Sequence, residues 1–156
     1  METIIRPAEE RDVPVLAGFE REISVISFGQ EAIVDEEFHA EKIRKALKKN
    51  NAGMLVMETS ENDYESKLIG WLWMDERTNS LTHETYVNFR SLYIAEAWRG
   101  RPESARLMAR GMAYCEGIGA SNVVGKVHIL NPGMRAMYKN FGFQATHLTM
   151  EYRFPC

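Results

Sequence analysis

The chain has 156 residues, the length of one ordinary domain with room for a buried core. Its 19 basic and 22 acidic residues are interspersed, which argues against a general nucleic-acid-binding protein. Its 45% apolar content excludes a disordered or fibrous chain. We therefore expect residues 1–156 to form a single domain.

The cysteines and the apolar runs bear on metals and membranes. Cys115 and Cys156 cannot form a disulfide framework, and neither has metal-ligand spacing, so no metal site is predicted. The first residues lack the apolar core of a signal peptide, and the longest apolar run, residues 68–74, is too short to span a bilayer. These features predict a cytoplasmic protein with neither a membrane nor a nucleic acid as partner.

The N-terminal half is predicted to begin with a strand followed by two helices. The elements are a short strand at residues 4–5, a helix between Asp12 and about Gly29, a helix over 36–49, and strands over 54–57 and 68–74. The polar residues 59–67 are interpreted as a long hairpin loop. Asp35 suits the cap of the second helix, whose acidic start and lysine-rich end match the helix dipole.

The C-terminal half alternates strands and helices. Its predicted elements are a strand over 86–94, a helix opening at Pro102, a strand over 123–129, a short helix behind Asn131 and Pro132 with Gly142 at its end, and a closing strand over 148–154. The closing strand is predicted because apolar and polar residues alternate there. The whole order indicates a mixed sheet with helices on its faces.

The segment from Ser91 to Arg110 has features of an anion site. A strand, a turn and a helix start expose backbone N–H groups beside the positive end of the helix dipole, which suits a phosphate. Arg99 and Arg101 add positive charge there. The alternative is that these arginines are simply solvated.

A second segment adds specificity. Val127-x-x-x-Asn131, then Met134, Tyr138 and the run to Phe143, together with the Ser91–Arg110 segment, resembles the GNAT superfamily of N-acetyltransferases over almost the whole chain. The resemblance implies an α/β (α+β) fold with a mixed, mostly antiparallel sheet, helices on both faces and a splayed central strand pair. It also implies acetyl transfer from acetyl-CoA to a primary amine of a small molecule or peptide, by direct attack and without a metal.

The resemblance further implies which residues would hold the coenzyme. The backbone of Leu92, Tyr93 and Ile94 would pair with the pantetheine arm, Asn131 would lie near that arm, and the pyrophosphate would be held by Arg99, Gly100, Arg101, Pro102, Glu103 and Ser104. Tyr138 would lie near the thioester sulfur and supply a proton or a hydrogen bond. The alternatives are a packed aromatic role for Tyr138 and a plain helix cap for Asn131.

The coenzyme loop departs from the family pattern Arg/Gln-x-x-Gly-x-Gly/Ala. Pro102 and Ser104 occupy the two glycine places, and Pro102 has no N–H to offer a phosphate. Ser104 keeps its amide and adds a hydroxyl, while Glu103 puts an anion beside the expected anion site. These departures motivate a competing hypothesis, a noncatalytic coenzyme A-binding or interaction module on the same fold.

The general base is left open. Members of the family often carry a glutamate on the strand before the coenzyme loop, but residues 88–91 contain no carboxylate. Either a water chain to Glu84, Asp75 or Glu76 removes the amine proton, or the neutral fraction of the acceptor suffices.

Two further residues allow two interpretations each. Arg90 could bind an anionic acceptor or reach solvent, and His128 could act as a base or serve a structural role. The apolar closing strand could also support a homodimer.

Overall fold

The structure, a computed structural model, describes residues 2–62 and 65–155. Its strands and helices, in chain order, are β1 (Glu2–Pro7), η1 (Glu10–Asp12), α1 (Val13–Phe28), η2 (Gly29–Glu31), α2 (Glu36–Lys49), β2 (Met54–Asn62), β3 (Glu65–Thr78), β4 (Thr85–Ile94), η3 (Glu96–Trp98), α3 (Pro102–Gly117), β5 (Val123–Gly125) and α4 (Pro132–Asn140). The helices η1, η2 and η3 are single 3₁₀ turns. None of the described helices is long and apolar enough to cross a bilayer.

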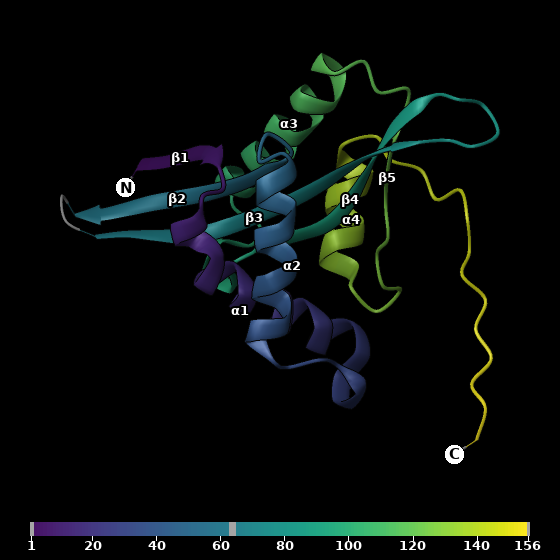
Figure 1. The fold of residues 1–156 in the computed structure, drawn as a ribbon, viewed down its shortest axis with the longest axis horizontal. Coiled ribbons are helices and arrows are strands. Elements are labelled where there is room, and N and C mark those ends of the chain that lie inside the picture. The colour runs from purple at the N-terminus through teal and green to yellow at the C-terminus, as the bar shows by residue number, and fades with distance from the viewer. Residues whose placement is uncertain (1, 63–64, 156) are drawn as a thin grey trace. The chain divides into compact units, whose positions relative to one another are not determined.

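The strands form one sheet in the order β1-β2-β3-β4-β5 (Figure 1). The pairs from β1 to β4 are antiparallel, and β5 runs parallel to β4. The β4–β5 ladder is short, because it joins only Val87–Phe89 to Val123–Gly125. The sheet is therefore mixed and mostly antiparallel, as the sequence predicts, and β4 leaves its parallel neighbour halfway along its length.

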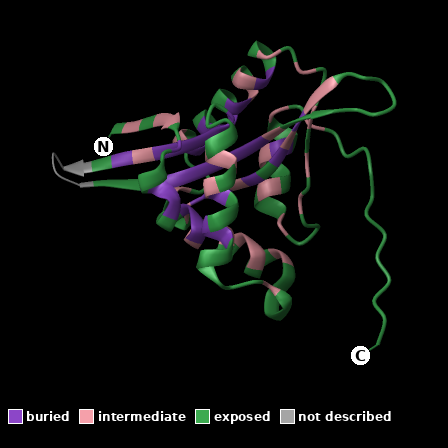
Figure 2. Cartoon of the chain, viewed as in Figure 1, coloured by how far each residue is buried: buried purple, intermediate pink, exposed green. Residues whose placement is uncertain are grey.

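Helices cover both faces of the sheet. On one face Phe19 of α1 stacks on Tyr93 of β4, with ring centroids 4.3 Å apart. The core on this face also includes Trp71 of β3 and Ile43 of α2. On the other face the side chain of Leu107 of α3 fills the space above Gly70 of β3. Successive residues of β3 alternate between the two cores, and all of residues 68–74 are buried (Figure 2).

The predicted starts of α2, α3 and α4 are confirmed, but the side-chain cap predicted for α1 is not formed. The Asp35 side chain accepts a hydrogen bond from the Glu37 amide at 3.0 Å, and the Asn131 side chain accepts one from the Met134 amide at 3.2 Å. Pro102 and Pro132 stand in the first turns of α3 and α4. Asp12 precedes α1 but does not cap it with its side chain.

The predicted long loop over 59–67 is wrong. β2 continues to Asn62 and β3 begins at Glu65, while residues 63–64 lie outside the described part of the chain. Polar residues stay in the strand here because β1 pairs with them, Glu2 opposite Ser60, and the Thr59 hydroxyl donates to the Glu2 carbonyl at 3.2 Å. Pairing between strands thus overrides the loop-like composition.

Two predicted strands are also corrected near the C-terminus. The strand expected over 123–129 ends at Gly125, and the closing strand over 148–154 is not formed. Its apolar side chains are 76–86% exposed, at Leu148, Met150, Tyr152 and Phe154 (Figure 2). Alternation favours a strand only where a neighbouring strand takes up the backbone hydrogen bonds, and none of the described residues pairs with this segment.

The chain divides into two compact units, Met1–Lys126 and Val127–Cys156. The first contains the sheet and the helices α1, α2 and α3, and the second contains α4 and the C-terminal segment.

Candidate functional site

The outer edge of β4 is free of strand pairing from Arg90 to Ile94 in the part of the chain that the structure describes. The Ala95 amide donates to the Ile69 carbonyl of β3 at 2.8 Å, so Ala95 directs its backbone groups toward β3. Because these directions alternate along a strand, Tyr93 also directs its backbone toward β3, whereas Leu92 and Ile94 direct theirs outward. Two of the three residues predicted to pair with a pantetheine arm thus present open main-chain groups.

Arg99 ties the following loop to this edge. Its Nε donates to the Ile94 carbonyl at 2.8 Å, and its guanidinium carbon lies 5.6 Å from the ring centre of Tyr93. Gly100, with a φ of +76°, adopts the left-handed conformation that favours glycine, and the chain turns there into α3. The Arg101 guanidinium packs over Trp98, 4.9 Å from its ring centre. Both arginines therefore lie between the end of β4 and the start of α3.

The start of α3 offers few free hydrogen-bond donors. The Ser104 amide and hydroxyl both donate to the Arg101 carbonyl, at 3.1 and 2.7 Å, and Pro102 has no N–H. The Gly100 and Glu103 amides make no backbone hydrogen bond within the described chain. One carboxylate oxygen of Glu103 is buried without a hydrogen-bond partner. The N-terminus of α3 is thus an electropositive end with two open amides and an adjacent acid.

The face of the sheet toward α1 carries two aromatic donors side by side. Trp71 and Tyr93 are cross-strand partners, and each donates to a carboxylate of α1: Trp71 Nε1 to Glu20 at 2.8 Å, and the Tyr93 hydroxyl to Glu22. Burial, and next the hydrogen bond to Glu22, raise the pKa of Tyr93 to about 12. These bonds fasten α1 to the strand that precedes the loop from Arg99 to Ser104.

Arg90 occupies a bulge in β4. Trp73 faces Ser91 and Met74 faces Phe89, so Arg90 is an extra residue between two paired positions. Its guanidinium carbon lies 3.9 Å from the ring centre of Trp73, and its Nη1 is 3.9 Å from the nearer Asp75 oxygen. The bulge is at the point where β4 leaves β5.

The second unit holds Asn131 and Tyr138. Asn131 caps α4 with its side chain, so the helix-cap interpretation is confirmed. Tyr138 is buried, with the Phe143 ring edge-on at 4.9 Å between centroids, and burial raises its pKa to about 12. The phenol therefore keeps its proton at neutral pH.

Two other residues have local partners. His128 lies in a loop and not on a strand, and its Nδ1 accepts a hydrogen bond from the Leu130 amide at 3.0 Å. Cys115 is buried beside the Met74 sulfur, and burial raises its pKa to about 11, which makes it an inert thiol at neutral pH.

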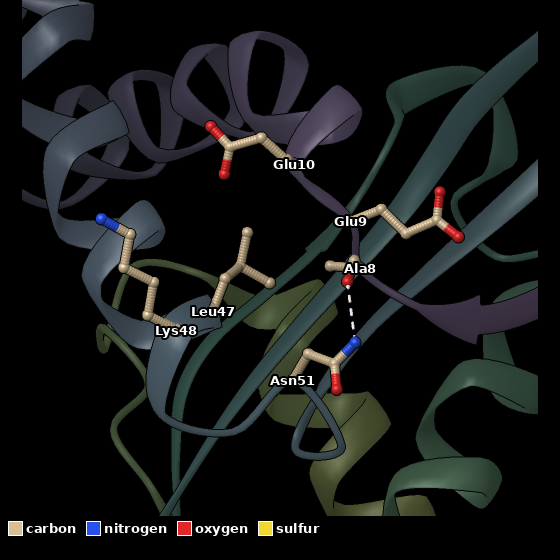
Figure 3. A pocket seen from close by; sticks show the side chains of 6 residues that line it. All are labelled: Ala8, Glu9, Glu10, Leu47, Lys48 and Asn51. Carbon is tan, nitrogen blue, oxygen red and sulfur yellow. Dashed lines mark hydrogen bonds between the residues drawn. The ribbon is translucent and has the colours of Figure 1, made fainter.

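A separate hollow lies in the first unit, between the end of β1 and the end of α2 (Figure 3). Its lining residues are Ala8, Glu9, Glu10, Leu47, Lys48 and Asn51, none of which is a predicted site residue. The Asn51 amide donates across it to the Ala8 carbonyl at 3.4 Å. Among residues 2–62 and 65–155, no group of three or more histidine, cysteine or acidic side chains is arranged to hold a metal ion.

Residues 21–143 match the acetyltransferase (GNAT) family, and this chain belongs to that family. Membership indicates acetyl transfer in general, and the family generally uses acetyl-CoA as donor. No curated protein matches the sequence.

Solved structures with the same fold are distant in sequence. A putative acetyl transferase from Pyrococcus furiosus has 23% identity and a TM-score of 0.74, covering 98% of this chain and 100% of its own. Glucosamine-6-phosphate N-acetyltransferase from Arabidopsis thaliana has 16% identity and a TM-score of 0.69, covering 99% and 100%. A transcriptional regulator from Bacillus halodurans C-125 has 15% identity and a TM-score of 0.74, covering 98% and 100%. At these identities the likeness establishes the fold alone.

The structure brings most of the predicted site residues together. Leu92 to Ile94 and the loop from Arg99 to Ser104 form one continuous stretch of the first unit, while Asn131 and Tyr138 belong to the second. Sequence reasoning missed the bonds from α1 to Trp71 and Tyr93 and the bulge at Arg90. No local signal could have revealed the two bonds, because they join residues 51 and 71 positions apart.

Proposed function

We propose that this protein transfers an acetyl group from acetyl-CoA to a primary amine by direct attack of the amine on the thioester. The observation that carries the proposal is the open outer edge of β4, which leads directly into an electropositive helix start. A pantetheine arm carries amide groups and pairs with such an edge as an added strand would.

The residues present fit the arm of the coenzyme. The Leu92 N–H and carbonyl and the Ile94 N–H are directed outward, whereas the Ile94 carbonyl is already taken by Arg99. Of the three predicted residues, we assign the backbone contacts to Leu92 and Ile94. Tyr93 instead contributes its side chain to the α1 face.

The pyrophosphate seat is assigned to the loop before α3 and to its first turn. The open amides of Gly100 and Glu103 supply donors, and the charges of Arg99 and Arg101 supply attraction. Pro102 provides no donor but fixes the first helical turn, and the Ser104 hydroxyl, which donates to Arg101, can still accept a hydrogen bond but has no proton left to give.

Bound acetyl-CoA supplies a thioester whose carbonyl carbon accepts the amine nitrogen, after which the C–S bond breaks and the sulfur leaves as a thiolate. The amine gives up one proton and the sulfur gains one, so the proton balance closes. Tyr138, with a pKa of about 12, holds its proton more tightly than a thiol of reference pKa about 8.5. We assign it the role of donating a hydrogen bond to the leaving sulfur.

The proposal is tested by calorimetry with acetyl-CoA and by turnover of Tyr138→Phe against an amine panel. We expect wild type to bind acetyl-CoA, and Tyr138→Phe to lose about tenfold to a hundredfold in kcat with nearly unchanged coenzyme affinity, because it loses a hydrogen bond to a charged group. Tyr152→Phe, a change at an exposed tyrosine of the same unit, is the matched control.

Absence of binding at millimolar acetyl-CoA, or binding without turnover of any amine, overturns the proposed function. Unaltered turnover of Tyr138→Phe removes only the role of Tyr138.

A further inference from the structure

The bulge of β4 presents a cation on the α1 face of the sheet. Arg90 is the extra residue, and its side chain is 39% exposed. Its guanidinium lies over Trp73, and that ring is buried, so the cation rests on a fixed aromatic surface. Arg90 is therefore held in place by stacking and not by hydrogen bonds.

The hydrogen-bonding edge of Arg90 is left open by this arrangement. A guanidinium stacked through its flat face keeps its N–H groups directed sideways. The nearest carboxylate, Asp75, is 3.9 Å from Nη1, which is an ion pair but too long for a hydrogen bond. None of the described residues accepts a hydrogen bond from Arg90.

The proposed course of the coenzyme ends at this residue. With the pyrophosphate at the start of α3, the arm runs back along β4 from Ile94 to Leu92 and so toward Arg90. The acyl group is carried at the far end of that arm. The open edge of Arg90 thus lies at the bulge next to the place where the amine must approach.

The local charge selects the kind of anion. A carboxylate matches the planar, two-donor edge of one guanidinium, and it carries a single charge. Asp75 lies on the same face, opposite Asn88 of β4. It is shared by Arg77, at 3.5 Å, and Arg90, at 3.9 Å, so the three side chains together carry one net positive charge. One net positive charge balances a singly charged carboxylate but not a doubly charged phosphate, so the site favours a carboxylate.

We infer that the acceptor is an amine that also bears a carboxylate, and that Arg90 binds this carboxylate and so determines acceptor specificity. This inference rests on the proposed function. It names the substrate class as amino acids or short peptides whose carboxylate lies a few bonds from the reacting nitrogen.

The test compares Arg90→Met and Arg90→Lys with wild type on matched acceptors, namely glycine, β-alanine and 4-aminobutyrate and the amide of each. Methionine preserves an apolar contact with Trp73 and removes the charge, while lysine preserves the charge and removes the planar edge. Arg77→Met is the control, because Arg77 also contacts Asp75, at 3.5 Å, and is exposed. Differences in amine pKa cancel when each variant is compared with wild type on the same acceptor.

We expect wild type to acetylate the carboxylate member of at least one pair. Arg90→Met should lower kcat/KM for that acceptor about tenfold to a hundredfold and for its amide less than about threefold. For the carboxylate acceptor, the kcat/KM of Arg90→Lys should lie between the values for wild type and Arg90→Met. Arg77→Met should change kcat/KM for neither member of the pair. Equal losses on both members of the pair, or no loss, overturn the inference.

A readout besides activity separates this inference from the proposed function. Acceptor binding is measured by calorimetry in the presence of coenzyme A, and the coenzyme affinity of Arg90→Met is measured alone. If no amine is acetylated, the proposed function fails, and the inference stands only if wild type binds the carboxylate acceptor and Arg90→Met does not. If turnover occurs and Arg90→Met changes kcat/KM equally on both members of every pair, the proposed function stands and the inference fails.

Discussion

The two faces of the sheet are packed with different chemistry. Toward α3 the buried contacts are apolar: Leu107 packs over Gly70, and Gly111 allows the close approach of Leu72 and Phe89. Toward α1 and α2 the core is aromatic, and its rings carry polar atoms that bond to carboxylates of α1. The buried contacts of the α3 face are apolar, and its hydrogen bond from Arg106 to Thr3 is exposed, whereas the α1 face includes partly buried hydrogen bonds.

The difference shows where a reactive site can be built on this sheet. A polar atom in a buried layer needs a partner, so a face that already carries donors and carboxylates can hold or admit polar groups at low cost. The aromatic face also carries Arg90 and Asp75 at the bulge of β4. The apolar face serves as a platform, and α3 contributes its N-terminus to the proposed coenzyme seat.

The largest effect is expected on the apolar face. Leu107→Ala removes a fully buried side chain and should lower the free energy of unfolding by about 2–5 kcal/mol, measured by urea denaturation. The loss should be the same at pH 5 and pH 8, since no ionisable group is removed. Leu81→Ala, at a leucine that is 91% exposed, is the control. A strongly pH-dependent loss would contradict the distinction between the faces.

The next largest loss of stability is expected at the ion pair between Asp12, just before α1, and Arg6 of β1. Asp12 accepts two hydrogen bonds from Arg6, at 2.7 and 2.9 Å, and Arg6 also binds Glu58. Burial alone raises the pKa of Asp12, but the bonds from Arg6 and the Glu9 amide outweigh it, so the pKa is lowered. Asp12→Asn should cost about 2 kcal/mol, below the range for a fully buried pair because Arg6 keeps Glu58.

The pH dependence of this pair has a defined sign. Because folding lowers the pKa of Asp12, its contribution is present above the unfolded value of about 3.9 and is lost as pH falls through the folded value. The stability gap between wild type and Asp12→Asn should therefore narrow below about pH 4. Glu10→Gln, at an exposed acid, should show a much smaller gap at pH 7. A gap that is constant with pH would contradict the pairing.

The smallest effect is expected from Tyr93→Phe. This change keeps the stacking on Phe19 and removes the hydrogen bond to Glu22, whose carboxylate can return to water, so the cost should be about 1 kcal/mol. Since folding raises the pKa of Tyr93 from about 10 to about 12, wild type should lose its advantage over Tyr93→Phe as pH rises through that range. Denaturant unfolding at pH 8 and pH 11 tests both statements, and an advantage that persists at pH 11 would refute the second.

The helices and the order of elements could be predicted from the sequence because their signals are local. Asp35, Pro102 and Asn131 mark helix starts through their own backbone preferences, and each prediction is confirmed. Local signals could not decide whether the predicted closing strand forms. The alternation over 148–154 describes how a strand would present its side chains, but not whether another strand is available to pair with it.

The candidate site likewise has one part that local sequence signals predict and another part that depends on tertiary structure. The loop from Arg99 to Ser104 is predicted as a binding site through its position between a strand and a helix start, and that role stays a prediction. The bulge at Arg90 depends on how β3 and β4 register against each other, and the bonds to Glu20 and Glu22 depend on how α1 packs. Such features arise only from tertiary structure, so the composition of residues 88–91 left the role of Arg90 open.

The sheet keeps its strands in chain order, and this has a consequence for folding. β2, β3 and β4 are joined by short connections, so their antiparallel pairs can close early and quickly, whereas β5 must wait for α3 to cross the sheet before it adds in parallel. In a partly folded chain the outer edge of β4 would then already be formed and unpaired. Ligand present during refolding could bind this outer edge. Partly folded chains would also aggregate through the same unpaired edge.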